Sequence, residues 1–256
     1  MKTITIFGSW WGGNSGDTSI LYATMENLPQ EKVEKVIVYS SNPDLLQYYL
    51  DEFEFVEVRK SVTNYWGKVT FQSIRESDTV IIGGGGLIFS KKMHDPFYSH
   101  ILNIYPIVRI AKIVGTDVKL HAIGASHLES AISKFVTKSI VNHAGSVTVR
   151  DEKSLEILGE FGNNIIKVVS DPAFLLSDNP TDRVTDFISE FDQPFITVSL
   201  HSDIDKYATE TKEQIAKQVL EEVSEYAMKN EYAILLYNNY RDDDWLRTLG
   251  SQINSS

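Results

Sequence analysis

Residues 2–17 of the sequence read KTITIFGSWWGGNSGD, and this segment indicates the fold class. Its first part alternates threonine with isoleucine and phenylalanine, which is typical of a β-strand, and the glycines after it indicate a turn. A helical pattern follows from about residue 17 to residue 28. A strand, a glycine-rich turn and a helix in this order predict the opening unit of a parallel α/β sheet.

The same unit repeats along the chain. Short β-branched runs predict strands near residues 2–7, 34–39, 54–59, 78–82, 117–123, 146–150 and 165–169. Apolar patterns of helical length lie between most of them, at roughly 17–28, 43–51, 68–76, 97–114, 129–143 and 152–161. Several strands are apolar on both faces, as expected when helices cover both sides of a parallel sheet. The expected fold class is therefore α/β, with a Rossmann-like parallel sheet domain over residues 1–176.

A polar, turn-rich stretch at residues 177–194 predicts a linker to a second lobe. After it, strands are expected at 195–200 and 232–237, with a long helix at about 207–229 between them. So few elements do not make an independent sheet with both faces covered. We therefore expect residues 195–256 to form a short or truncated α/β lobe, whose apolar edges would favour a homo-oligomer.

Composition and charge exclude several classes of protein. The formal net charge is −11, and residues 177–256 supply −9 of it, from 16 acidic and 7 basic residues. A nucleic-acid-binding protein needs a basic surface, so we expect no nucleic-acid partner. The absence of cysteine excludes disulfides, thiol nucleophiles and cysteine-bound metals. No run approaches ~20 apolar residues, and the N-terminus does not resemble a signal peptide, so a cytoplasmic protein without a transmembrane segment is expected.

Two glycine-rich loops follow predicted strands, which is where ligands bind in open parallel sheets. The residues of these loops that we select as candidate ligand contacts are Gly12, Asn14, Gly16 and Asp17 in the first, and Gly84, Gly85 and Gly86 in the second. The first loop has neither the G-x-G-x-x-G spacing nor the lysine of a P-loop, so no dinucleotide is expected. Asp17 is either a site residue or the N-cap of a helix that begins at Thr18. The second loop, part of the run Gly83–Gly86, is either a site or a place of tight packing.

Other candidate residues also follow predicted strands. Arg150 ends a strand and is able to bind a carboxylate or phosphate with two hydrogen bonds, the alternative being an ion pair with a neighbouring aspartate. Asp151 is placed to cap the next helix, and Asp171 begins an Asp-Pro turn. His127 follows a strand and is a candidate proton donor, while His201 ends the first strand of the second lobe. The sequence contains neither a His-Glu-x-x-His motif nor a His/Asp spacing typical of metal ligands, so no metal site is predicted.

Four motifs occur in order along the chain: Asn14-x-Gly16-Asp17, Gly83–Gly86, Val149-Arg150-Asp151-x-x-Ser154 and Asp171-Pro172-Ala173-Phe174. Together they resemble the polysaccharide pyruvyl transferase family, over about residues 5–245. The resemblance implies two Rossmann-type lobes, as in GT-B glycosyltransferases. It also implies transfer of a pyruvyl group from phosphoenolpyruvate to two hydroxyls of a sugar, as a ketal, on a cell-surface glycan, an exopolysaccharide or its precursor.

The resemblance implies roles for individual residues, with phosphoenolpyruvate as donor substrate and no cofactor or metal. Arg150 would hold the anionic donor, His127 would donate a proton near the phosphate, and Asn14 with Asp17 would orient sugar hydroxyls. Asn238 and Asn239 stand where family members carry a histidine, and asparagine is no acid near neutral pH. Two other interpretations stay open: a GT-B-like glycosyltransferase that uses a nucleotide-sugar, and a non-catalytic relative that binds a sugar or an anion.

Overall fold

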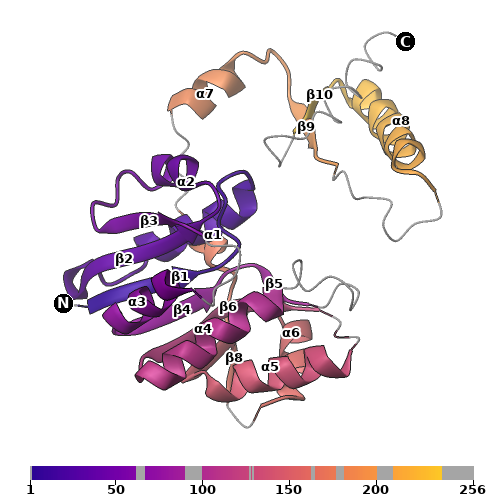
Figure 1. Cartoon of the computed structure of the whole chain (residues 1–256). Helices are drawn as coiled ribbons and strands as arrows, with labels where there is room; N and C mark the ends of the chain where they lie inside the picture. The colour runs from indigo at the N-terminus through magenta and orange to yellow at the C-terminus, as the bar shows by residue number, and fades with distance from the viewer. Residues whose placement is uncertain are drawn as a thin grey trace. The chain divides into compact units, whose positions relative to one another are not determined.

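The computed structural model describes residues 2–61, 67–89, 100–126, 128, 130–162, 165–176, 182–200 and 210–237. The chain divides into two compact units, Met1–Leu176 and Ser177–Ser256, each coloured by its place in the sequence in Figure 1. The first unit contains all seven strands expected from the repeated pattern.

The first unit is built on a parallel sheet in the strand order β3-β2-β1-β4-β6-β7-β8, with β5 paired to β6. The chain starts in the middle of this sheet, builds outward to β3 and returns to the other side of β1. The strand order therefore reverses between β1 and β4, which is where open α/β sheets bind ligands. The strands are β1 (Lys2–Phe7), β2 (Val33–Ser40), β3 (Val56–Lys60), β4 (Thr79–Gly83), β5 (Gly86–Ile88), β6 (Asp117–Ala125), β7 (Ser146–Val149) and β8 (Ile166–Val168).

Helices cover both faces of the sheet. Along β1, Ile4 and Ile6 belong to one buried cluster and Phe7 to the other, as the alternation of side chains on a strand requires. The first cluster contains residues of α1 (Ser15–Glu26) and α2 (Pro43–Tyr49). The second contains residues of α3 (Lys68–Glu76), α4 (His100–Val114), α5 (Ala131–His143) and α6 (Glu152–Gly159). Helices α4 and α5 lie side by side in Figure 1. The 3₁₀ helices of this unit are η1 (Gln30–Lys32) and η3 (Pro172–Leu175).

The structure corrects one sequence interpretation at the start of α1. The helix begins at Ser15, and its N-cap is Asn14, whose side-chain oxygen accepts hydrogen bonds from the N–H groups of Gly16 at 2.9 Å and Asp17 at 3.4 Å. The expectation that Asp17 caps a helix starting at Thr18 was wrong, because Asn14 occupies the cap position three residues earlier. The Asp17 side chain is thus available for another role. The capping role of Asp151 in α6 is confirmed, since its Oδ1 accepts from the N–H of Ser154 at 2.7 Å.

The second unit contains α7 (Asp182–Ser189), β9 (Phe195–Val198), α8 (Lys212–Asn230) and β10 (Ala233–Leu236). Strands β9 and β10 pair in parallel, and α8 connects them. Thr211 and Gln214 form a reciprocal capping box at the start of α8. Within the stretch 177–194 that the sequence predicts as a linker, residues 182–189 form α7. No helix in the described segments combines the length and the apolar run that a membrane crossing requires.

Candidate functional site

The two glycine-rich loops lie at the same edge of the sheet. Strands β1 and β4 are paired, with Phe7 opposite Ile82, so the loops that follow them leave the sheet side by side. A Cβ atom on Gly84 would lie 2.6 Å from the Trp10 ring, so there is no room for a side chain at that position. The first loop therefore packs directly on the second, at the point where the strand order reverses.

The glycine run forms a turn that other residues adopt with strain. Gly84 and Gly85 have φ angles of +74° and +84°, in the left-handed region that favours glycine. Gly86 then begins β5 and pairs with Gly124 of β6. The sequence predicted a loop here; the short strand β5 was missed because glycine carries no strand signal.

Arg150 lies against the backbone of this glycine edge. A Cβ on Gly124 would lie 2.8 Å from Nε of Arg150 and 3.0 Å from its Cζ, and a Cβ on Gly86 would lie 3.9 Å from its Nη2. The Arg150 side chain is 35% exposed, so part of the guanidinium is open to a ligand. The structure thus brings together the arginine and the glycine turn that the sequence singled out separately.

Arg150 also contacts two carboxylates. Its Nη1 lies 3.4 Å from Oδ2 of Asp171, and its Nε lies 3.5 Å from Oδ2 of Asp151. Arg150 therefore forms ion pairs with aspartates and also lies against the glycine turn, so both sequence interpretations apply to it. Asp171 reaches this position because η3 packs on α1, and its other oxygen accepts from the N–H of Ala173 at 3.1 Å. The Asp-Pro turn predicted from the sequence therefore also places a carboxylate beside Arg150.

Asp17 completes this cluster from the first turn of α1. A Cβ on Gly85 would lie 3.3 Å from Oδ1 of Asp17, so the carboxyl group lies against the glycine turn. Burial raises the pKa of Asp17 from 3.8 to about 6; Arg150 acts in the opposite direction, and Asp171 raises the pKa further. Asp17 consequently exchanges its proton close to neutral pH, as general acids and bases do.

A bulge in β6 sets the position of Gly124. The register of β6 against β7 shifts between Leu120 and Ile123, and Ala122 between them has a φ of +48°. The N–H of Ala122 donates to Oγ1 of Thr148 at 2.9 Å. This hydrogen bond replaces the backbone hydrogen bond between strands that the bulge prevents. Past the bulge, the N–H of Ala125 donates to Oγ of Ser154 at 2.8 Å. Sequence analysis missed this feature, because an alanine inside an apolar strand gives no sign of a bulge.

The remaining predicted site residues do not join the cluster. Asn14 uses its side-chain oxygen as the cap of α1, and Gly16 is exposed in the first turn of that helix. Gly12 has a φ of +79° and lies against Leu45 of α2. Four other predicted residues lie outside the described residues: His127, His201, Asn238 and Asn239.

A separate pocket of about 200 Å³ opens beside the glycine turn. Its wall combines the aromatic residues Phe7, Trp10, Trp11 and Tyr39, the polar residues Ser9, Ser41, Ser61 and Asn103, and Gly8, Ile82, Leu87, Ile104 and Ile107. The rings of Phe7 and Tyr39 stack with centroids 5.1 Å apart and planes 4° from parallel. Sequence analysis missed this pocket, because its residues come from separate parts of the chain and share no local pattern.

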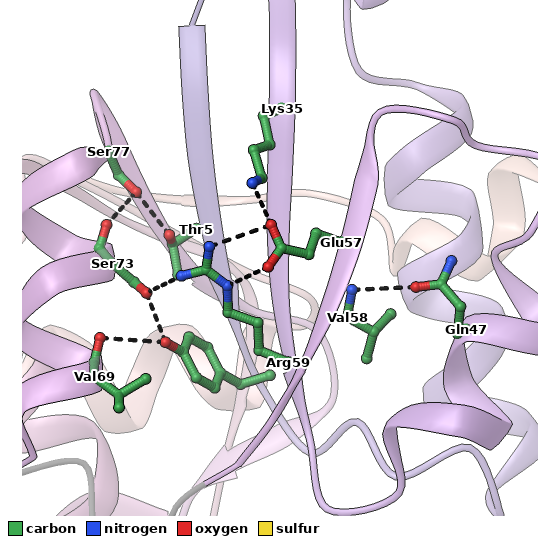
Figure 2. Close-up of polar contacts among 10 residues, drawn as sticks. Thr5, Lys35, Gln47, Glu57, Val58, Arg59, Val69, Ser73 and Ser77 are labelled. Atoms are coloured by element: carbon green, nitrogen blue, oxygen red, sulfur yellow. Dashed lines mark hydrogen bonds and ion pairs between the residues drawn. The ribbon is translucent and has the colours of Figure 1, made fainter.

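A polar network fixes Tyr39 at the back of this pocket. Its hydroxyl and Oγ of Ser73 lie 2.6 Å apart, and Nη1 of Arg59 donates to the same Ser73 oxygen at 2.8 Å. Figure 2 shows Arg59 between Ser73 and Glu57, whose carboxylate also contacts Lys35. The hydrogen bond from Arg59 is the main reason that the pKa of Glu57 falls to about 2. The network therefore holds the Tyr39 ring in place through the protein's own contacts.

The described residues contain no group of three or more His, Asp or Glu side chains placed to hold a metal ion. The arrangement is instead one guanidinium and three carboxyl groups against a glycine backbone, next to a pocket with aromatic walls. Such a site offers one partly exposed guanidinium to a ligand and, in Asp17, a carboxyl group with a raised pKa.

Comparisons with solved structures agree on the fold. The chain aligns over its whole length with a UDP-GlcNAc 2-epimerase of Methanocaldococcus jannaschii (TM-score 0.54, 14% identity, 71% of that chain). It aligns in the same way with the Neisseria meningitidis enzyme bound to UDP-GlcNAc (0.56, 13%, 70%) and with S. aureus MnaA solved with UDP (0.58, 16%, 67%). At these identities the likeness shows a shared GT-B-like α/β fold, and the chain spans about two thirds of the length of these structures.

A search of curated proteins found no match. The model of one protein family, polysaccharide pyruvyl transferase, matches residues 14–251, a range that covers most of both units and all four motifs. The chain therefore belongs to the polysaccharide pyruvyl transferase family.

Proposed function

We propose that this protein transfers a pyruvyl group from phosphoenolpyruvate to a sugar of a cell-surface glycan or its precursor, forming a ketal. The observation that carries the proposal is the cluster of Asp17, Arg150 and Asp171 against the glycine turn, in a chain of this family. Phosphoenolpyruvate contains its own leaving group, so the proposal includes no cofactor.

In this proposal Arg150 binds the carboxylate or the phosphate of the donor. Its contacts with Asp151 and Asp171, at 3.5 and 3.4 Å, are longer than the ~2.7–2.9 Å of a close charge-assisted hydrogen bond. A ligand anion is able to replace one of these contacts with a closer one. Because the cluster holds three carboxyl groups and one guanidinium, the anion binds most favourably when Asp17 is protonated.

Protonated Asp17 then has a direct chemical role. It donates its proton to the methylene carbon of phosphoenolpyruvate, and the positive charge that develops on C2 is attacked by the first sugar hydroxyl, whose proton returns to the Asp17 carboxylate. The second hydroxyl displaces inorganic phosphate, which closes the ketal and releases the second hydroxyl proton. His127 is proposed, as from the sequence, to donate a proton to the departing phosphate.

The experiment is to follow phosphate release from phosphoenolpyruvate with a broad panel of glycans, in the full chain and in Arg150→Ala. We expect release with at least one acceptor in the unmodified protein and none above background in the variant. Absence of release with every acceptor, in protein shown to be folded by circular dichroism, would contradict the proposal.

Two alternatives are separated by binding measurements. A glycosyltransferase that uses a nucleotide-sugar is favoured by structural neighbours solved with UDP and UDP-GlcNAc. Thermal stabilisation by UDP, with none by phosphoenolpyruvate, would support it. A non-catalytic sugar- or anion-binding relative would bind phosphoenolpyruvate less tightly after Arg150→Ala, while the unmodified protein shows no turnover.

A further inference from the structure

The pocket beside the glycine turn has a wall that combines flat rings with neutral polar groups. Trp11 is half-buried and its ring lies directly on Gly13, where a Cβ would overlap it. Phe7 and Tyr39, a stacked pair that is about 1% exposed, also line the pocket, and the Ser73–Arg59 network holds Tyr39. The half-buried Trp11 ring therefore offers the aromatic surface that a ligand is able to contact, while the buried pair supports the wall.

The polar groups of the pocket form a row. Ser9, Ser41 and Ser61 each follow the carboxyl end of a strand, and these strands, β1, β2 and β3, are neighbours in the sheet. Neighbouring strands lie ~4.8 Å apart, so the sheet spaces the serine positions at about that interval along its edge. Asn103 of α4 adds an amide from the opposite wall. A ligand with several hydroxyl groups along one edge is able to form hydrogen bonds with such a row of serines.

The pocket differs from the Arg150 cluster in charge. None of the described residues that line it is charged, so it offers no cation to neutralise a phosphate or a carboxylate. It does contain a buried donor with no described partner, Nε1 of Trp10, in a residue that is only 3% exposed. That nitrogen would lie 2.6 Å from a Cβ on Gly8, which also lines the pocket, and a buried indole N–H normally has an acceptor.

The pocket and the cluster share one segment of backbone. Ile82 and Leu87 line the pocket, and between them Gly85 and Gly86 lie against Asp17 and Arg150. The glycine turn therefore lies between residues of the pocket and residues of the cluster, and the Trp10 ring, which lines the pocket, lies against Gly84. We infer that the pocket binds a neutral pyranose ring of the acceptor, with its C–H face on the Trp11 ring and its hydroxyls on the serine row.

The inference that the bound sugar is the acceptor substrate rests on the proposed function. The binding test of the pocket does not depend on turnover. The probes are the methyl glycosides of glucose, galactose, mannose and N-acetylglucosamine, whose binding to the full chain is measured by saturation-transfer NMR. We expect at least one to bind, with about tenfold weaker binding in Trp11→Ala and about fivefold weaker binding in Asn103→Ala. Trp11→Phe keeps a ring and should restore most of the affinity.

Matched controls distinguish the pocket from the cluster. Lys112→Ala alters an exposed residue of the same helix as Asn103 and should leave glycoside binding unchanged. Arg150→Ala should weaken phosphoenolpyruvate binding and leave glycoside binding intact, whereas Trp11→Ala should do the reverse.

Each outcome decides between the two proposals. If no glycoside binds, if Trp11→Ala binds as the unmodified protein does, or if uridine displaces the glycoside, the pocket inference is overturned whatever phosphoenolpyruvate does. If glycosides bind and the pocket variants lose them, but phosphoenolpyruvate does not bind, the sugar site stands and the proposed transferase function fails.

Discussion

Replacing Asp17 by asparagine should make the protein more stable and inactive. Burial costs the ionised carboxylate free energy in the folded state, and the pKa of Asp17 is raised from 3.8 to about 6 for that reason. Each pKa unit corresponds to about 1.36 kcal/mol, so ionised Asp17 lowers the free energy of unfolding by about 3 kcal/mol at neutral pH. An asparagine side chain has a similar shape and no charge, so the substitution removes this penalty.

The effect has a defined pH window. Below about pH 4 the carboxyl group is protonated in both the folded and the unfolded chain, and the variant has no advantage. Between about pH 4 and 6 the unfolded chain loses this proton while the folded chain keeps it, so the stability of the unmodified protein falls. Above about pH 6 the Asp17 carboxyl group is ionised in both the folded and the unfolded chain. The gain in the free energy of unfolding from Asp17→Asn is then complete, and it corresponds to a melting temperature higher by about 5–10 °C.

The assay is urea unfolding at pH 4.5 and pH 7.5, with phosphate release measured at pH 7.5. Asp44→Asn is the matched control, because Asp44 also lies in the first turn of a helix but is exposed; it should bring no gain and a small loss, of about 0.3–1 kcal/mol, from the helix dipole. An equal gain from Asp17→Asn at both pH values, or a loss at pH 7.5, would show that the ionised Asp17 carboxylate does not destabilise the fold. Retained turnover would refute the role of Asp17 in proton transfer.

Three further predictions concern the same edge of the sheet. Arg150→Lys keeps the charge but loses the planar two-donor fork, and kcat/KM for phosphoenolpyruvate should fall about 10- to 100-fold in a steady-state assay; an unchanged value would show that Arg150 does not bind the donor. Gly124→Ala places a Cβ 2.8 Å from Nε of Arg150 and should displace the guanidinium. Activity should therefore fall with little change in melting temperature, while Gly159→Ala, at the end of α6 with nothing within 4 Å, should be fully active. Ala122→Gly should change the free energy of unfolding by less than about 1 kcal/mol, because relief of the strain at a φ of +48° offsets the loss of a fully buried methyl group; a larger loss of stability in urea would contradict the strain.

The sequence predicted the parallel sheet well, because its strands are apolar on both faces and its helices lie between them at regular spacing. It also placed Arg150 and the Gly83–Gly86 run at strand ends, which in a parallel sheet share one edge. Two features of the site do not follow from the hydrophobic periodicity of the sequence. Asp171 comes close to Asp17 because η3 packs against α1, and the pocket of Phe7 and Tyr39 depends on the register of separate strands.

The sequence analysis and the structure differ where local signals compete. Asp17 and Asn14 are both good N-cap residues, and only the backbone at Asn14, with φ −109° and ψ 114°, decides between them. Residues 182–189 follow turn-forming residues and were assigned to a linker, although their apolar residues have helical spacing. The strand β5 begins with glycine, which favours turns, and forms because Gly86 pairs with Gly124.

The contact of η3 with α1 joins the last element of the first unit to its first helix. Asp171 follows Asp17 by 154 positions in the chain, yet the two carboxyl groups influence each other through space. During synthesis, the glycine turn and Asp17 leave the ribosome long before Asp171 does. The anion cluster is therefore assembled only when β8 and η3 have docked, and a nascent chain that stops short of them has no complete cluster. Long-range closure of this kind also slows folding, since distant segments must meet before either gains from the contact.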